Sequence, residues 1–220
     1  MDSHEVRREW AERSGEYSPD YYAYYGPDET SESVRSIADR LTGPDPAILE
    51  LGCSSGRHLA HLLEHGYRDL TGIELNGDAF DVMADAYPDL AADGTFYHDS
   101  IEAVVEAVPD DRFDLVYSVE TLQHLHPDAT WVFDELARIT CGHLVTIENE
   151  GDDQESPPGD ADPVEGVSYV NDEFPLYYRD WDRIFTERGL ESVPVTDDER
   201  SVVHGVDTVR AFRSVATVEE

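Results

Sequence analysis

Lysine is absent from this chain: all 15 basic residues among its 220 are arginine. A chain without a lysine amine cannot form a Schiff base with pyridoxal phosphate or with a carbonyl substrate. It also lacks the lysine that contacts the phosphates in a P-loop. The sequence therefore excludes pyridoxal-phosphate and P-loop chemistry.

Cysteine and long apolar segments are scarce as well. The chain has only Cys53 and Cys141, without a Cys-x-x-Cys pair, so it predicts neither a disulfide framework nor a cysteine zinc site. Its uninterrupted apolar runs are far shorter than the roughly 20 residues of a membrane-spanning helix. The first residues are polar, unlike those of a signal peptide. We expect a soluble, cytoplasmic protein without membrane association.

Acidic residues dominate the charge. The 50 Asp and Glu residues against 15 Arg give a formal net charge of −35. In molar salt the Debye length is about 3 Å, so neighbouring carboxylates barely repel one another. A strongly acidic chain without lysine is similar to the proteins of extreme halophiles, and we expect haloarchaeal character; an ordinary acidic protein is the alternative. The acidity also disfavours a nucleic-acid partner, because neutralising phosphates dominates such affinity.

Short apolar runs and helical patterns alternate along most of the chain. Strands are predicted for the five apolar runs at 47–51, 70–74, 94–98, 113–119 and 143–147. Strict alternation of strands with helices is typical of an α/β fold with a doubly wound parallel sheet. After an acidic loop at 150–162, a helix is predicted over 177–188, and segments 191–195 and 208–212 are predicted to form a hairpin. We expect residues 31–220 to form one domain.

Tyrosines cluster in residues 1–30, which we expect to form a separate arm. A short helix around Trp10 is followed by five tyrosines flanked by proline and glycine, and this pattern predicts an irregular segment. A second aromatic segment, 167–178, follows the fifth strand. We expect both segments to cover a bound substrate; the alternative is that their rings only pack against the sheet. The candidate substrate and lid residues are Tyr21, Tyr22, Tyr25, Tyr177 and Tyr178.

The first predicted strand ends in a glycine-containing turn. Ligands of open α/β sheets bind at the carboxyl ends of the strands, and Gly52 and Gly56 allow the backbone to turn tightly there. The dinucleotide fingerprint requires glycine at its first, third and sixth positions. Here those positions hold Gly52, Ser54 and Arg57, so NAD is disfavoured.

Polar residues follow the next three predicted strands. Glu74 ends the second strand, where an acid accepts hydrogen bonds from ribose hydroxyls. Asp99 follows the third strand and is either an adenine ligand or the cap of the next helix. Glu120 and His124 follow the fourth strand and face the reacting end of a ligand, so they are the catalytic candidates.

Three histidines, His58, His61 and His65, lie on the helix after the first strand. The i,i+4 spacing of His61 and His65 is one that metal ligands use. No His-Glu-x-x-His pattern accompanies it, and we interpret the three side chains as a solvated helix face. We expect no metal.

Four segments together resemble motifs of the class I S-adenosylmethionine-dependent methyltransferases, in the family's order: 48–56, 70–76, 98–100 and 113–120. Ser54 stands where many members have a glycine. The resemblance implies S-adenosyl-L-methionine as cofactor. It also implies a Rossmann-like seven-stranded sheet in the order 3-2-1-4-5-7-6, with the last strand antiparallel. The cofactor contacts that it implies come from Glu50, Gly52, Cys53, Ser54, Gly56, Glu74, Leu75, Asn76, Asp99, Ser100, Ile101 and Val119.

The family resemblance implies in-line transfer of a methyl group. No Asn-Pro-Pro-Tyr run and no Pro-Cys nucleophile occur, so base-modifying subfamilies are disfavoured and a small-molecule acceptor remains. A general base is needed only if the acceptor must first lose a proton. Two alternatives stay open: a non-catalytic regulator that binds S-adenosylmethionine, and a nucleotide-dependent oxidoreductase.

The charge leads to a prediction about salt. Removing salt should lower the melting temperature, because repulsion among the carboxylates is then unscreened. Circular dichroism from molar to millimolar KCl measures this, and a constant melting temperature would contradict the halophilic interpretation.

Overall fold

The computed structural model describes residues 1–151, 166–170, 174–195, 202–203 and 207–215. The predicted acidic loop at 150–162 lies almost wholly outside these residues. None of the described helices is long and apolar enough to cross a membrane.

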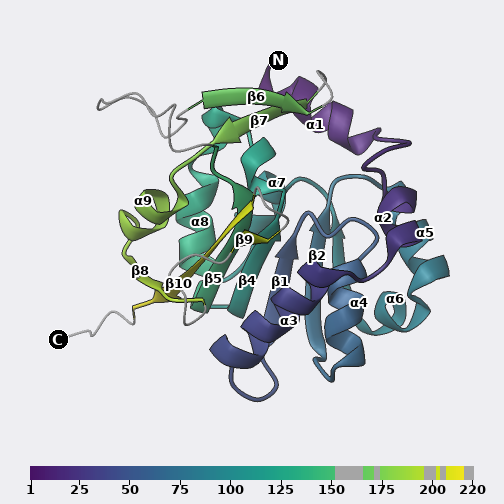
Figure 1. Cartoon of the computed structure of the whole chain (residues 1–220), viewed down its shortest axis with the longest axis horizontal. Helices are drawn as coiled ribbons and strands as arrows, with labels where there is room; N and C mark the ends of the chain where they lie inside the picture. Colours follow the sequence, from purple (N-terminus) through teal and green to yellow (C-terminus); the bar gives the residue numbers. More distant parts are fainter. Residues whose placement is uncertain (152–165, 171–173, 196–201, 204–206, 216–220) are drawn as a thin grey trace.

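A mixed β-sheet forms the centre of the molecule (Figure 1). Its strand order is β3-β2-β1-β4-β5-β10-β8, with β9 beside β10. The first five strands pair in parallel, whereas β10 is antiparallel to both β5 and β8. The predicted order 3-2-1-4-5-7-6 and the terminal hairpin are therefore confirmed. The strands are β1 (Ala47–Leu51), β2 (Asp69–Glu74), β3 (Thr95–His98), β4 (Phe113–Val119), β5 (Thr140–Asn149), β8 (Leu190–Val193), β9 (Val202–Val203) and β10 (Asp207–Ser214).

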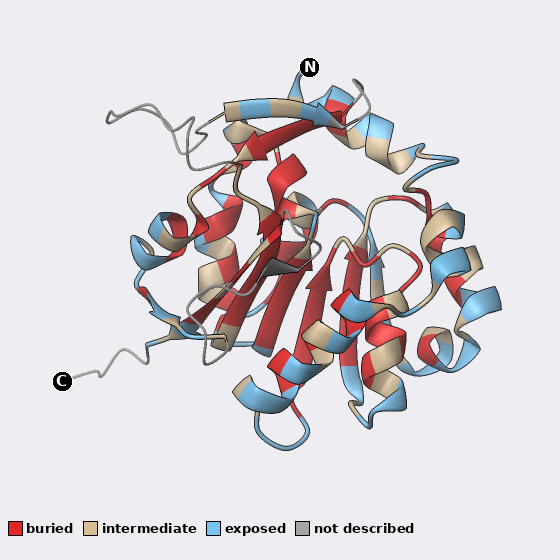
Figure 2. Cartoon of the chain, viewed as in Figure 1, coloured by how far each residue is buried: buried red, intermediate tan, exposed pale blue. Residues whose placement is uncertain are grey.

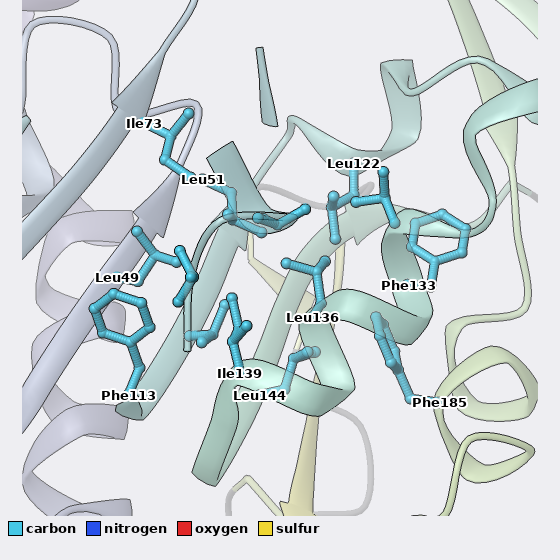
Figure 3. Close-up of a cluster of buried hydrophobic side chains, with 14 of the residues drawn as sticks. Leu49, Leu51, Ile73, Phe113, Leu122, Phe133, Leu136, Ile139, Leu144 and Phe185 are labelled. Atoms are coloured by element: carbon cyan, nitrogen blue, oxygen red, sulfur yellow. The ribbon is translucent and has the colours of Figure 1, made fainter. Parts of the chain in front are cut away.

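Helices cover both faces of the sheet, because alternate residues of a strand point to opposite sides. Ile48 packs with one layer and Leu49 with the other. The buried sheet between two half-exposed helical layers is visible in Figure 2, and part of one core is drawn in Figure 3. One layer contains α3 (Glu29–Leu41), α4 (Arg57–Glu64), α5 (Asp78–Ala86) and α6 (Pro88–Asp93). The other contains α7 (Ile101–Val105), α8 (Val132–Ile139) and α9 (Trp181–Thr186).

The tyrosine-rich segment is helical, which corrects the prediction of an irregular arm. Helix α2 (Pro19–Tyr25) follows α1 (Ser3–Ala11). Ser18 caps α2 by accepting a hydrogen bond from the Tyr21 amide, and proline at the first helical position suits a helix start. Gly26 ends the helix with a φ of +66°. Proline and glycine therefore bound a helix here instead of breaking one.

The predicted helix at 177–188 is also wrong in its first part. Strand β7 (Phe174–Tyr178) pairs with β6 (Gly166–Val170) as a separate antiparallel hairpin. Helix α9 begins only after Asp180, whose side chain accepts a hydrogen bond from the Arg183 amide. Two short 3-10 turns, η1 (Leu122–His124) and η2 (Pro127–Ala129), follow β4.

Candidate functional site

A cavity lies over the carboxyl ends of β1, β2 and β4, and it encloses about 1190 Å³ of empty space including its open mouth. We call it the strand-end cavity. Fourteen of the predicted site residues line it: Tyr22, Glu50, Gly52, Cys53, Ser54, Glu74, Leu75, Asn76, Asp99, Ser100, Ile101, Val119, Glu120 and His124. The other five are not among the lining residues: Gly56, Tyr21, Tyr25, Tyr177 and Tyr178.

The turn from β1 into α4 adopts left-handed backbone at Gly52, Ser54 and Gly56. A Cβ on Gly52 would lie 2.4 Å from the Thr121 Oγ1, so glycine allows the turns after β1 and β4 to touch. At Gly56 a Cβ would lie 2.7 Å from the side chain of Leu90 on α6. Gly56 therefore serves the packing of α4, while Gly52 shapes the cavity.

Glu74 ties the turns after β1 and β2 together. Its Oε2 accepts a hydrogen bond from the Ser54 amide at 2.8 Å, and its Oε1 accepts one from the Asn76 amide at 2.7 Å. Burial raises the pKa of this carboxyl, and the backbone donors oppose the rise. Carboxylate oxygens have further lone pairs, so Glu74 keeps acceptor capacity toward the cavity.

Glu50 is a buried acid, only 2% exposed, at the next-to-last position of β1, and it lines the cavity. Among the described residues its Oε2 has no hydrogen-bond partner. Burial raises the pKa of Glu50 to about 8; Tyr117 and the Arg57 guanidinium oppose the rise, and Glu74 adds to it. A buried acceptor without a partner is costly, and a cationic donor in the cavity would satisfy it.

The turn after β3 presents Asp99 and Ser100. Ser100 caps α7, because its Oγ accepts a hydrogen bond from the Ala103 amide at 3.2 Å. Asp99 accepts only the amide of Ser100 among the bonds in the described residues, at 2.7 Å. The structure thus assigns the helix cap to Ser100 and leaves Asp99 exposed at the cavity.

Helix α1 covers one part of the cavity, a contribution that the sequence did not predict residue by residue. Arg7 reaches across to Glu102 of α7 at 2.9 Å. The Trp10 ring lies 4.7 Å from the His124 ring and 4.4 Å from that of Phe174, measured between centroids. Periodicity could place Trp10 on a helix, but not against His124 and Phe174, which are more than a hundred positions away.

Helix α2 covers another part through Tyr22. The Arg57 guanidinium lies 4.8 Å from the Tyr22 ring centre, and its Nη1 donates to Asp28 at 2.7 Å. Burial raises the pKa of Tyr22, and the Glu120 carboxylate adds to the rise. Arg57 therefore lines the cavity, with the Asp28 carboxylate and the Tyr22 ring as neighbours. The sequence showed it only as a residue that does not fit the dinucleotide fingerprint.

His58 is buried at 5% exposure, which corrects its interpretation as part of a solvated face. Its Nδ1 lies 2.8 Å from the Ser31 Oγ, and the ring lines the strand-end cavity. His61 contacts Glu32 at 3.1 Å on the outside of the same helix. The described residues contain no group of three potential ligands that could hold a metal.

The turn after β4 carries Glu120 and His124. Glu120 has a left-handed φ of +47°. The His124 Nδ1 lies 2.8 Å from the Pro175 carbonyl oxygen, which only accepts, so Nδ1 carries the hydrogen and Nε2 is the acceptor. Burial lowers the pKa of His124 to about 4. The ring is therefore neutral near pH 7.

The remaining predicted tyrosines pack against other groups of the protein and do not line the cavity. Tyr21 packs on Tyr25 within α2, with ring centres 4.9 Å apart. Tyr177 stacks on the Arg179 guanidinium at 5.2 Å. The Tyr178 ring lies against Gly151, where a Cβ would come within 3.0 Å of it.

Residues 48–141 match a family model described as a methyltransferase domain. Within these residues the chain carries a methyltransferase domain, of the class I S-adenosylmethionine-dependent type. Its methyl donor is S-adenosylmethionine. No curated protein matches the methyltransferase.

Solved structures match almost the whole methyltransferase. A 1,6-didemethyltoxoflavin-N1-methyltransferase from Burkholderia thailandensis is 18% identical, with a TM-score of 0.69 over 97% of this chain and 91% of that one. A geranyl diphosphate C-methyltransferase from Streptomyces coelicolor is 16% identical, with a TM-score of 0.63 over 97% and 98%. At these identities the likeness shows the fold.

Replacing Glu74 with alanine in the methyltransferase should destabilise the ligand-free chain. The amides of the half-buried Ser54 and the buried Asn76 would lose their acceptor, which costs about 2–4 kcal/mol in total. Urea unfolding measures the change. The matched control is Glu64→Ala at an exposed position of α4; equal stability of the two variants would contradict the role of Glu74 in joining the turns.

Proposed function

We propose that the methyltransferase acts on a small organic acceptor, held together with S-adenosylmethionine in the strand-end cavity. The observation that carries this proposal is the cover formed by α1 and α2, whose Arg7, Trp10 and Tyr22 line the cavity opposite the strand ends. Apolar and aromatic side chains line the cavity together with a few acids and arginines, a composition typical of pockets for small ligands.

The structural neighbours support a small acceptor. One was solved with bound 1,6-didemethyltoxoflavin and S-adenosylhomocysteine, and another with geranyl diphosphate and S-adenosyl-L-homocysteine. Both cover more than nine-tenths of this chain. The same architecture thus accommodates small acceptors of different chemistry.

In this proposal, the adenosine end of the donor binds at the carboxyl ends of β2 and β3. Glu74 accepts hydrogen bonds from the ribose hydroxyls with its remaining lone pairs. Asp99 is exposed at the cavity and accepts from the adenine amine. The other lining residues that flank this end in the proposal are Leu75, Asn76, Ser100 and Ile101.

The methionine end of the donor binds at the carboxyl end of β1, beside Cys53, Ser54 and Val119. Glu50 supplies the unpartnered oxygen for the ammonium group. Arg57, whose charge acts on Glu50, stands near enough to favour the carboxylate of the same amino acid. A buried acid and a cation together fit a zwitterion.

Residues 1–30 serve as the lid over this domain. The contacts Arg7–Glu102 and Tyr22–Arg57 tie α1 and α2 to opposite parts of the cavity. Covering helices exclude water and align the reactants. Of the five candidate tyrosines this proposal keeps Tyr22 as an aromatic lid residue, and it adds Trp10.

The donor, when bound, supplies a methyl group on a sulfonium that an acceptor displaces in line. Glu120 and His124 stand at the acceptor side, after β4. The low pKa of His124 makes it a weak base, so its neutral ring orients the acceptor molecule by contact. Glu120 takes a proton where the acceptor must lose one.

The acceptor class is testable with extracts of the source organism and isotopically labelled S-adenosylmethionine. Label should accumulate in compounds of low molecular mass, because the cover limits the size of the acceptor. Separation of the products by size measures this. Label found mainly in protein or nucleic acid would contradict the proposal.

Donor binding should release a proton near pH 7 through Glu50. Its pKa of about 8 leaves it protonated in the free protein at that pH, and an ammonium partner favours the carboxylate. The release should approach about one proton near pH 7 and vanish above about pH 9, where Glu50 is already ionised. Titration calorimetry with S-adenosylhomocysteine in buffers of different ionisation enthalpy measures it.

The control is Glu50→Gln, which keeps the size of the side chain and cannot release a proton. Proton release of the same size in this variant would show that another group titrates. The pKa of Asp207 is also raised to about 8, by burial first and by Glu120 and Glu148 next. Asp207→Asn therefore serves as the second comparison.

A further inference from the structure

A buried carboxylate and a buried guanidinium meet at the turn after β4. Glu148, near the end of β5, and Arg179, just after β7, are both 0% exposed. Removing a charge from water costs several kcal/mol unless hydrogen bonds replace the solvent. The two side chains therefore need partners, and both find them in the backbone of residues 121–125, which we call the η1 turn.

Glu148 holds the amino-terminal side of the η1 turn. Its Oε1 accepts from the Thr121 and Leu122 amides at 3.2 and 3.0 Å, and its Oε2 accepts from the Gln123 amide at 3.1 Å. The Ser118 hydroxyl also donates to Oε1. The first amides of a helical turn have no partner within the turn, and one carboxylate satisfies three of them here.

Arg179 holds the carboxyl-terminal side. Its Nη1 donates to the Leu122 carbonyl at 3.0 Å, and its Nη2 donates to the Leu125 carbonyl. The guanidinium also faces the rings of Tyr177, Phe133 and Trp181. The turn is thus held between a negative side chain at its amides and a positive one at its carbonyls, which is the favourable order for its dipole.

Two contacts toward the strand-end cavity depend on the position of this turn. Thr121 lies against Gly52, where a Cβ would come within 2.4 Å of its Oγ1. His124 donates from Nδ1 to the Pro175 carbonyl, and its ring faces Trp10. Gln123 Nε2 lies 3.4 Å from the His124 Nε2. A shift of the turn would therefore change the acceptor side first, because His124 is part of the turn, whereas Gly52 belongs to the separate turn after β1.

We propose that Glu148 and Arg179 are positioning residues that hold the η1 turn so that the neutral His124 ring faces the methyl acceptor. The role of His124 toward an acceptor rests on the proposed function. The adenosine end, at β2 and β3, is outside the reach of both side chains. Loss of either positioning residue should change His124 while leaving donor affinity nearly unchanged.

The test is the ring nitrogen spectrum of His124 in the full-length chain near pH 8. Nitrogen-15 NMR of the wild type should show one neutral tautomer with hydrogen on Nδ1, and His124→Gln identifies the signal by its loss. The Glu148 carboxylate now accepts hydrogen bonds from backbone N–H groups. In Glu148→Gln, the side-chain NH2 group would face some of these N–H groups, and it cannot accept from them. The two ring nitrogen shifts should converge toward a tautomer mixture, while the Kd for S-adenosylhomocysteine changes less than about twofold.

Glu150→Gln is the matched control, because Glu150 follows the same strand but pairs with Arg210 at 2.6 Å. It should leave the His124 signal unchanged. Arg179→Lys retains the charge but not the forked contact to Leu122 and Leu125, and it gives the same readout if Glu148→Gln does not fold. A lower melting temperature with an unchanged His124 tautomer would overturn the proposal and leave both residues merely structural.

The outcome is independent of the acceptor class. The tautomer is read without an acceptor, so a failed search for small methylated products would contradict the proposed function alone. Normal binding of S-adenosylhomocysteine with an unaltered His124 in both variants would contradict the positioning role alone.

Discussion

The parallel pairing of β1 with β2 and β4 is the constraint on which the rest of the structure depends. Its register places Leu51 beside Ile73 and Ser118, so three strands end at nearly the same level. The chain must reverse beyond that level, and left-handed backbone at Gly52 and Glu120 accomplishes this. Side chains from distant parts of the sequence therefore face one cavity.

The half-buried Glu74 and the buried Glu148 and Glu50 show how the site uses charge. Glu74 accepts hydrogen bonds from two backbone amides, and Glu148 accepts them from three backbone amides and a hydroxyl. These hydrogen bonds stabilise the turns and satisfy both carboxylates. Glu50 retains an oxygen without a partner among the described residues. The first two shape the protein, and the third is the acid that we propose contacts the donor, because an unsatisfied buried acceptor is costly.

Arginine connects the cover to the sheet. Arg7 joins α1 to α7 through Glu102, and Arg57 joins α4 to Asp28 before α3 and to the ring of Tyr22. Half-buried pairs of this kind are less exposed to screening than surface pairs. Salt should therefore weaken the pairs that hold the cover less than it weakens ion pairs on the surface.

The sequence by itself determined the strands β1 and β4, whose ends it predicted to the residue, together with the sheet order and the acids at strand ends. Those features rest on local apolar runs and on a resemblance in short motifs. It did not distinguish Glu148 or Glu50 from the other 48 acids, place Trp10 over His124, or recognise that Tyr177 lies in a strand. Only the tertiary structure decided these points, because burial, pairing and ring contacts join residues that are far apart along the chain.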